Sequence, residues 1–532
     1  MKLTRREFIF GGFGVAGLGV LSQLIPGMNV SGIISNEKIP GSIVGASAKF
    51  GHMLRDAKSF PQPTETIETD VAIIGGGIAG LSAAWKLKDK KVIILELEQN
   101  LGGNSQSGEN TVSPYPWGAH YVPLPTEESI YVRELFEKIG VIKGYDSGLP
   151  IYDEYYLCHE PDERLYIYGR WQDGLVPSVG ATDEDKHQYR EFFSAMDSFK
   201  NAMGKDGKRA FAIPLDFSSQ DNKFLQYDQI TMAEFMRQRG WNSKYLNWYI
   251  NYCCRDDYGA TYNDVSAWAG IHYFASRAGK AANSQVQDVV TWPEGNGWLV
   301  KKLKTLIKAE TKTSALVYEV NGNSVNYYDV AQNKTVLVKA KAIIMATPHF
   351  ISARLTGNGM NVDKLSYAPW MVANITLDAM PRGEGQELSW DNVIYDSEML
   401  GYVVATHQNL DSRPQKTVIT YYWPLSEKSP KEARQAAIAR SYDDWQKVLL
   451  TELLRVHPEL KGKVRNIDVW LWGHGMVRPV PGYIWGSERK ELAKNKPPIF
   501  YAHSDMSGIS IFEEAQYHGV KAAEAVKEYL AA

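Results

Sequence analysis

A glycine-rich turn between two short apolar strands is the feature that most constrains the fold of this chain. The apolar run at residues 70–74 leads directly into Gly75-Gly76-Gly77-Ile78-Ala79-Gly80, and residues 81–87 then carry apolar side chains at helical spacing. A second apolar run at residues 91–95 ends at Glu96, whose carboxylate is placed to accept hydrogen bonds from a ribose. This order of strand, G-x-G-x-x-G turn, helix, strand and acid predicts a Rossmann unit that binds a dinucleotide.

Each residue of the turn has a physical role in such a unit. Gly75 permits the tight turn, Gly77 lets the backbone approach a diphosphate, and Gly80 lets the helix pack closely on the strand. Backbone N–H groups at the start of the helix, at Ile78 and Ala79, meet the diphosphate charge at the positive end of the helix dipole. The sequence therefore predicts that a dinucleotide cofactor lies across this turn.

The first 48 residues have the pattern of an export signal. Arg5-Arg6 precedes Phe8 and an uncharged stretch, residues 8–25, that contains five glycines. A charged segment followed by an apolar one is typical of secretory signals, and the paired arginines resemble a twin-arginine signal. The alternative is a short buried N-terminal helix, which five glycines disfavour because each costs about 1 kcal/mol in a helix interior.

Recognition by the twin-arginine export machinery predicts a periplasmic or otherwise exported protein. That route carries folded proteins, which suits a chain that binds its cofactor before export. Ala46-Ser47-Ala48 offers a cleavage site, and retention of the segment as an N-terminal membrane anchor stays open. Residues 49–65 lack periodicity and contain Pro61-Gln62-Pro63, which predicts a linker.

Composition narrows the range of functions. The formal net charge of −3 and the pI of about 6.4 argue against nucleic-acid binding, which needs a basic surface. The three cysteines do not make a disulfide framework, and no spacing of His, Cys and Asp predicts a metal site. The 30 tyrosines and 15 tryptophans are explained either by core packing or by an aromatic-walled substrate cavity.

The segment after Glu96 resembles the flavin-containing amine oxidase and phytoene desaturase superfamily. Gly102 and Gly103 follow Glu96 at the family's spacing, whereas Asn104 stands where the family usually has Arg. The resemblance implies FAD rather than NAD as the cofactor, with Asn104 leaving an Arg-to-phosphate contact in doubt.

Two distant segments carry the same resemblance. Residues 314–347 resemble the family's returning hairpin and strand, in which Val317 or Val320 would lie near the adenine. The C-terminal residues 499–519 resemble its closing motif. By that match, Asp505 holds the ribityl–phosphate region and Phe512 offers a backbone N–H at a helix start facing the flavin.

The resemblance implies an α/β fold in which an FAD-binding Rossmann-type domain is interleaved with an α+β substrate domain. The FAD-binding domain is expected in three parts, at residues 66–130, 291–350 and 466–532. The substrate domain is expected in two parts, at residues 131–290 and 351–465.

Two departures from the family pattern affect the chemistry. Amine oxidases commonly place a Lys beside flavin N5, and in the matching stretch that position is Asn374. The covalent link to cysteine found in some relatives has no counterpart, because residues 472–476 contain no Cys, so FAD is expected to be held non-covalently. Without the Lys, a quinone or another electron acceptor is as plausible as oxygen.

Several further residues are candidates for the substrate site. His120 could steer a substrate proton, although a packed structural His is the more common case. Trp472, His474 and Trp485 are expected over the flavin ring. Residues 255–257, Arg-Asp-Asp, lie among tyrosines and predict either an ammonium site or a solvated turn with a local ion pair.

These observations favour an exported FAD-dependent oxidoreductase of amine oxidase type, in which hydride passes from a substrate C–H next to an amine nitrogen to flavin N5. Asn374, His120 and Trp472 are the candidate catalytic residues. Two alternatives remain at this stage. One is a flavin-dependent desaturase or isomerase of an apolar substrate, and the other is a flavin-binding protein without catalysis.

Overall fold

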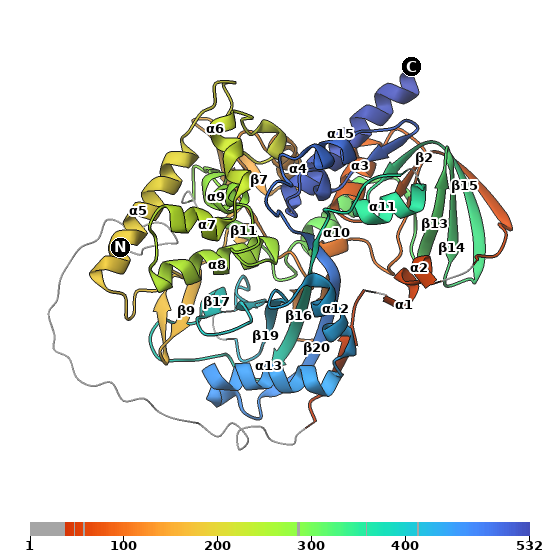
Figure 1. The fold of residues 1–532 in the computed structure, drawn as a ribbon. Helices are drawn as coiled ribbons and strands as arrows, with labels where there is room; N and C mark the ends of the chain where they lie inside the picture. Colours follow the sequence, from red (N-terminus) through yellow and green to blue (C-terminus); the bar gives the residue numbers. More distant parts are fainter. Residues whose placement is uncertain (1–37, 47, 57–58, 285–287, 358, 412–413) are drawn as a thin grey trace.

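The computed structural model describes residues 38–46, 48–56, 59–284, 288–357, 359–411 and 414–532. The twin-arginine segment lies outside these residues. Two large sheets, three two-stranded sheets and the helices that cover the large sheets make up the described chain (Figure 1). None of the helices in the described ranges combines the length and hydropathy that a membrane crossing requires.

The first sheet contains the Rossmann unit. Its order is β12-β3-β2-β15-β14-β13, and β21 pairs with the second half of the long strand β15. The strands from β12 to β15, and β21, run parallel, whereas β13, β14 and β15 form an antiparallel meander on the right of Figure 1. The strand bounds are β2 Glu65–Ile74, β3 Val92–Leu95, β12 Glu310–Lys312, β13 Ala315–Asn321, β14 Ser324–Asp329, β15 Lys334–Met345 and β21 Ile499–Tyr501.

Both faces of this sheet are covered, which explains the continuous apolar run of β2. Val71 and Ile73 pack in a core with helices α3, α10 and α15, whereas Ala72 and Ile74 pack in a second core on the opposite face. The covering helices are α3 Ile78–Lys86, α10 Gly297–Leu306 and α15 Phe512–Ala531. The predicted order of strand, turn, helix and strand is therefore confirmed.

The second sheet lies mainly in the part of the chain expected to form the substrate domain, and it has eight strands in the order β1-β20-β16-β19-β18-β17-β9-β10. Alternate residues of strand β16 face opposite sides of this sheet. Trp370 and Val372 pack toward the helical layer, whereas Met371 and Ala373 pack toward α12 and α13. The bounds are β1 Gly41–Val44, β9 Glu163–Ile167, β10 Arg170–Asp173, β16 Tyr367–Leu377, β17 Asp391–Ile394, β18 Gly401–Val404, β19 Thr417–Pro424, β20 Val464–Val477, α12 Pro430–Ala439 and α13 Tyr442–Val456.

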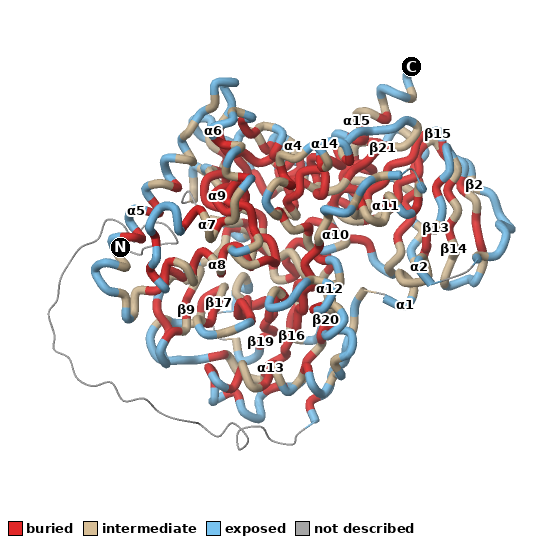
Figure 2. Tube along the Cα trace, in the orientation of Figure 1, coloured by how far each residue is buried: buried red, intermediate tan, exposed pale blue. Residues whose placement is uncertain are grey.

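The helical layer lies on the other side of this sheet, where Figure 2 shows a buried interior beneath exposed outer turns. Its helices are α5 Asp183–Lys200, α7 Met232–Gln238, α8 Lys244–Tyr258 and α9 Ala267–Ala275. Polar caps fix where they begin. The Thr182 side chain accepts from the N–H of Asp185 in a capping box at α5, and Ser243 and Ser266 cap α8 and α9.

Three segments lie in a different layer from the one expected. The strand β20 belongs to the eight-stranded sheet, because it pairs with β16, so residues 466–477 lie in the substrate domain. Residues 41–44 pair with β20. The segment α4 Ile130–Lys138, β7 Ile142–Asp146 and β8 Leu149–Tyr152 packs in the core of the Rossmann sheet and its helices.

Candidate functional site

A cavity of about 340 Å³ runs along the carboxyl ends of the parallel strands, and we call it the cofactor cavity. It begins beside Glu96, passes the glycine turn and reaches the start of α15. Ligands of open α/β sheets bind in this position. The wall includes these sequence-predicted residues: Gly75, Gly77, Ile78, Ala79, Glu96, Gly102, Gly103, Asn104, Asp505 and Phe512.

The glycine turn leaves room for a diphosphate. Gly75 has a φ of +102°, and a Cβ there would lie 2.4 Å from the carbonyl oxygen of Ala346. Gly77 is the N-cap of α3 and contributes no side-chain cap to the helix, so no side chain competes for the N–H groups at the helix start. Gly103 lies against Gly77, where a Cβ on Gly103 would be 3.3 Å from the Gly77 Cα. This cradle suits an anion held by backbone N–H groups.

Gly80 acts by packing and does not line the cavity. A Cβ at Gly80 would lie 2.0 Å from the carbonyl oxygen of Gly75, so only glycine lets α3 approach β2 this closely.

We expect Gly80→Ala to destabilise the folded protein by about 1–3 kcal/mol, because helix and strand must separate. Gly144→Ala is the matched control, since a Cβ at Gly144 meets nothing within 4 Å. Denaturant unfolding of both variants measures the difference. Equal stability of the two variants would contradict the close packing.

Glu96 lies in the wall of the cofactor cavity, and two backbone N–H groups fix its carboxylate. Its carboxylate accepts the N–H of Gly76 at 2.7 Å and the N–H of Glu98 at 2.9 Å. Burial raises the pKa of this carboxyl, although both N–H donors favour its ionised form. The remaining acceptor capacity of Glu96 fits a ribose with two hydroxyl groups.

Asn104 lies in a short 3-10 helix that starts at Gly103, and its side chain binds the second sheet. Its side-chain amide donates to the carbonyl oxygen of Gly475 in β20, so the residue in the place of the family's Arg ties the two domains together. Asn104 also lines the cofactor cavity.

Val320 does not line the cofactor cavity, whereas Val317 does. Both were candidates for the adenine end. The register of β13 against β14 shifts between Val317 and Glu319, and Val320 is buried in the core instead, with 3% of its surface exposed. The cavity wall is formed by the start of β13, where Ala315, Leu316 and Val317 lie.

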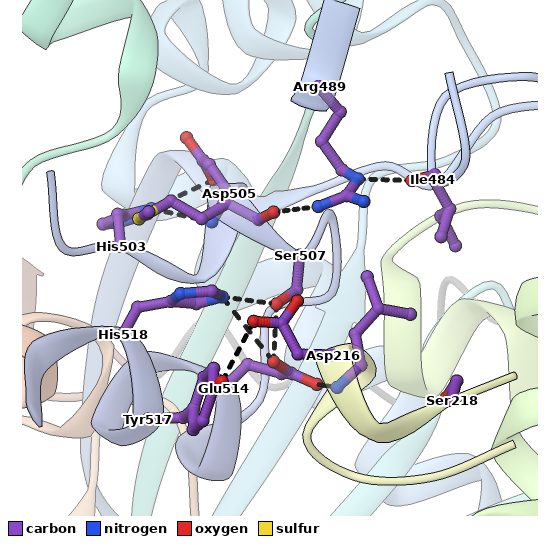
Figure 3. Close-up of polar contacts among 12 residues, drawn as sticks. Asp216, Ser218, Ile484, Arg489, His503, Asp505, Ser507, Glu514, Tyr517 and His518 are labelled. Atoms are coloured by element: carbon purple, nitrogen blue, oxygen red, sulfur yellow. Dashed lines mark hydrogen bonds and ion pairs between the residues drawn. The ribbon is translucent and has the colours of Figure 1, made fainter. Parts of the chain in front are cut away.

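Asp505, in the C-terminal segment that resembles the closing motif, is fully buried and lines the cofactor cavity (Figure 3). Its Oδ2 accepts the N–H of His349 at 2.8 Å, at the start of α11 His349–Thr356, and the hydroxyl of Tyr367. Burial alone would raise the pKa of Asp505, but the nearby His503 and His349 and the hydrogen bonds lower it to about 2. Asp505 is therefore an ionised acceptor that lines the cavity.

The start of α15 is fastened to the substrate domain by buried polar contacts, which Figure 3 shows together. Glu514 accepts the N–H of Leu215 at 2.6 Å and the Ser507 hydroxyl at 2.5 Å. One turn later, the Tyr517 hydroxyl donates to Asp216 at 3.0 Å. The contact between Glu514 and Leu215 joins residues 299 positions apart in the chain, so no local sequence pattern indicates it.

A second cavity of about 150 Å³ opens beside the cofactor cavity, and we call it the substrate cavity. The walls that the two cavities share are Asn104, Ala119, Gly475, Ser510, Ile511 and Phe512. Aromatic side chains of the eight-stranded sheet, Trp370, Tyr422 and Trp472, form much of its remaining wall. Ile511, the N-cap of α15, provides no side-chain cap to the helix.

Two of the three candidate catalytic residues line the substrate cavity. His120 stacks on Tyr422 with ring centroids 4.7 Å apart. The Trp472 indole donates to the carbonyl oxygen of Trp117 at 2.7 Å, which fixes the ring in the wall. His474 lines the cofactor cavity instead, and Trp485 packs on Trp268 outside both cavities.

Asn374 lines neither cavity. It lies two residues beyond Val372 on the same face of β16, where it is 2% exposed. Its amide donates to the carbonyl oxygen of Pro116 at 2.9 Å and accepts the Thr420 hydroxyl at 2.6 Å. This geometry gives Asn374 a packing role, and Trp370 and Val372 are the β16 residues that border the cavity.

The solvated turn considered for residues 255–257 is wrong, because these residues form the last buried turn of α8. Arg255 pairs with Glu427 at 3.1 Å, whereas Asp257 pairs with Arg277. Asp256, Asp257 and Arg277 all line the substrate cavity, together with Glu513 from the first turn of α15. Sequence reasoning missed Arg277 and Glu513, since nothing in their local sequence marks them.

Comparisons with known proteins agree with this architecture. Residues 73–139 match the NAD(P)-binding Rossmann-like domain family. The oxidoreductase PigB of Serratia sp. (strain ATCC 39006) is 22% identical over 89% of this chain and 78% of its own length. The flavin-containing amine oxidase B of Sus scrofa is 25% identical over 54% of this chain, and the match spans about half of that relative (51%).

The fold is shared with solved structures. The cyclohexylamine oxidase of Brevibacterium oxydans IH-35A superposes with a TM-score of 0.62 at 14% identity, over 87% of this chain and all of the other (100%). The chain therefore contains a Rossmann-like domain, is similar in sequence to an oxidoreductase and to flavin-containing amine oxidases, and shares the fold of a solved amine oxidase.

Proposed function

We propose that this protein is an exported FAD-dependent oxidoreductase that oxidises small-molecule amines at the C–H next to nitrogen. The observation that carries the proposal is a substrate cavity, walled by aromatic rings and acidic groups, that opens on the cofactor cavity at the start of α15. Bound FAD would supply the hydride acceptor. The residues of this chain would bind and orient the amine beside it.

The cavity walls have the properties that a substituted ammonium group requires. Trp370, Trp472 and Tyr422 present aromatic rings, which attract cations through their negatively charged faces. Asp256 and Asp257 add negative charge, whereas Arg277 is the single Lys or Arg among the described residues of the wall. This balance favours a cationic substrate over an anionic one.

The residues around the cofactor cavity fit FAD. The glycine cradle and the start of α3 would hold the diphosphate, Glu96 the ribose, and Asp505 the ribityl region. The start of α15, at Ile511 and Phe512, would face the flavin, where the positive end of the helix favours negative charge on the reduced ring. None of the three cysteines lines either cavity, which supports non-covalent binding. Acid precipitation of the protein tests the non-covalent binding, and all of the flavin is expected in the supernatant.

Anaerobic titration with primary amines, diamines and polyamines is the test of the activity. We expect at least one of them to bleach the visible absorption band of the bound flavin. A panel that never reduces a flavin that dithionite can reduce would remove the amine assignment. Reoxidation by oxygen and by a soluble quinone, followed separately, identifies the class of electron acceptor.

Desaturation or isomerisation of an apolar substrate is the second candidate. The apolar part of the cavity wall, with Ile213, Val372 and Met476, favours it. The Glu513 carboxyl group in the same wall disfavours it, because an apolar ligand would give this buried group no hydrogen bond. Flavin reduction by a polyene but by no amine would select this candidate.

Export through the twin-arginine route is part of the proposal. It is supported by Arg5-Arg6 and the glycine-containing apolar stretch that follows. Cell fractionation of the full chain, compared with an Arg5→Lys/Arg6→Lys variant, tests it. Retention of the variant in the cytoplasm is expected, and periplasmic recovery of both proteins would contradict it.

A further inference from the structure

Glu513 places a carboxyl group in the substrate cavity next to the wall that both cavities share. It is the second residue of α15 and follows Phe512, which belongs to the shared wall. Glu513 lines the substrate cavity but not the cofactor cavity, and only 3% of its surface is exposed. A substrate in the cavity would therefore meet this carboxyl on the side where the cofactor cavity opens.

The neighbour of Glu513 on the same helix has a different environment. The Glu514 carboxylate is occupied by the Leu215 N–H and the Ser507 hydroxyl, outside the substrate cavity. Glu513 has only its own backbone N–H as a hydrogen-bond donor within the described residues. Its carboxyl group thus retains acceptor capacity for a ligand, whereas that of Glu514 is used in holding the domains together.

The charged and titratable groups that face Glu513 come from three other parts of the chain. Asp256 and Asp257 lie at the end of α8, Arg277 follows α9, and His120 lies before β6 Tyr121–Pro123. Arg277 is already engaged, because it pairs with Asp257 and its guanidinium lies 4.2 Å from the centre of the Tyr273 ring. Burial raises the pKa of Glu513 to about 7, with Arg277 opposing and Asp257 reinforcing the shift.

We propose that Glu513 binds the ammonium group of the substrate and accepts a proton from it before the C–H bond is oxidised. This inference rests on the amine oxidation proposed above and assigns the residue that makes the amine reactive. In this step R–NH3⁺ gives one proton to the Glu513 carboxylate, which yields the neutral amine R–NH2 and the Glu513 carboxylic acid. No electrons move in this step, and the N–H bond that breaks is replaced by an O–H bond.

The chemistry of amines requires such a step. A free alkylammonium has a pKa near ~10, so about one molecule in 10³ is neutral at pH 7. Hydride leaves the carbon readily only when the nitrogen lone pair is free to stabilise the positive charge that develops. In a cavity with apolar walls, burial lowers the pKa of the ammonium and raises that of the carboxyl, so the two values approach each other.

A bound cation that cannot be oxidised gives a test that does not depend on turnover. The probe is tert-butylammonium, which has no C–H bond next to nitrogen, titrated into the FAD-loaded enzyme by calorimetry at pH 7 in two buffers of different ionisation enthalpy. A carboxyl with a pKa of about 7 is half protonated there, so binding of the cation should release about half a proton. Glu513→Gln should release none and bind the probe ~10-fold or more weakly.

The matched control is Glu528→Gln, the same change at an exposed position of the same helix. It should keep wild-type affinity and proton release. Glu513→Asp, which keeps the carboxyl group, should retain part of the proton release. This variant provides the test if Glu513→Gln does not fold. Wild-type proton release in Glu513→Gln would overturn the proposal.

The rate of anaerobic flavin reduction by a reactive amine provides the second readout. In the wild type this rate should rise with pH through about pH 7, as Glu513 ionises. In Glu513→Gln the rise of the rate near pH 7 should be absent. If no amine reduces the wild-type flavin, the proposed function fails. If amines reduce the wild-type flavin and the rate in Glu513→Gln still rises with pH near pH 7, only the role of Glu513 fails. Binding of trimethylacetate through Arg277, with no binding of tert-butylammonium, would overturn the ammonium site.

Discussion

Replacement of Asp505 by alanine is expected to cause the largest loss of both stability and FAD binding. The fully buried carboxylate accepts the His349 N–H and the Tyr367 hydroxyl, and it lines the cofactor cavity. Removing one partner from a buried charged network costs about 3–5 kcal/mol, because the other partners stay buried without compensation. Denaturant unfolding of the FAD-free protein and fluorescence titration with FAD measure the two effects.

Asp505→Asn separates charge from shape, and Asp363→Ala in an exposed loop is the control. The asparagine keeps one oxygen acceptor, so it should destabilise the fold less than alanine. Retention of wild-type FAD affinity in Asp505→Ala would show that this carboxylate does not hold the cofactor.

The pH dependence of stability follows from the same residue. The pKa of Asp505 is lowered from 3.8 to about 2 in the folded protein, so its ionised form stabilises the fold at pH values above about 4. This stabilisation should disappear as the pH falls from about 4 to about 2. In Asp505→Asn, this contribution to the loss of folding stability between about pH 4 and about pH 2 should be absent. If the stability of Asp505→Asn falls with decreasing pH in the same way as that of the wild type, the lowered pKa of Asp505 is contradicted.

Glu96→Ala is expected to weaken FAD binding by a factor of about ten to one hundred. The variant removes a charged acceptor at the ribose end of the cavity, where such a hydrogen bond contributes about 1.5–3 kcal/mol. It also leaves the N–H groups of Gly76 and Glu98 without their partner, so the empty turn should lose order. Equilibrium dialysis with FAD measures the affinity.

Glu68→Ala is the control for this change, because Glu68 lies on the same strand β2 and is exposed away from the cavity. It should keep wild-type affinity for FAD. Unchanged FAD retention in Glu96→Ala would contradict the position of the ribose.

The Rossmann unit could be predicted because its determinants are local in sequence. Gly75, Gly77 and Gly80 are required by the turn, the diphosphate approach and the helix packing, all within six consecutive residues. The closing motif was predictable for the same reason, since Asp505 and Phe512 are close neighbours in the chain. Both lie in the cofactor cavity wall, as Glu96 does.

The substrate site could not be predicted in the same way. The family resemblance placed Asn374 beside flavin N5, but a shift of two residues along β16 moves a side chain from the wall of the substrate cavity to the Pro116 backbone. Val320 was misplaced by the register shift in β13. Both errors concern residues in strands, where a small difference in register changes which groups a side chain meets.

The sequence by itself determined the dinucleotide-binding turn, the acid after the second strand and the α/β character of the chain, because each depends on residues close together in the sequence. Only the tertiary structure decided which charged groups meet in the substrate cavity. Asp257, Arg277 and Glu513 come from the end of α8, the segment after α9 and the start of α15, up to 256 positions apart. Their proximity is produced by the packing of α15 across both domains, which no local pattern of residues encodes.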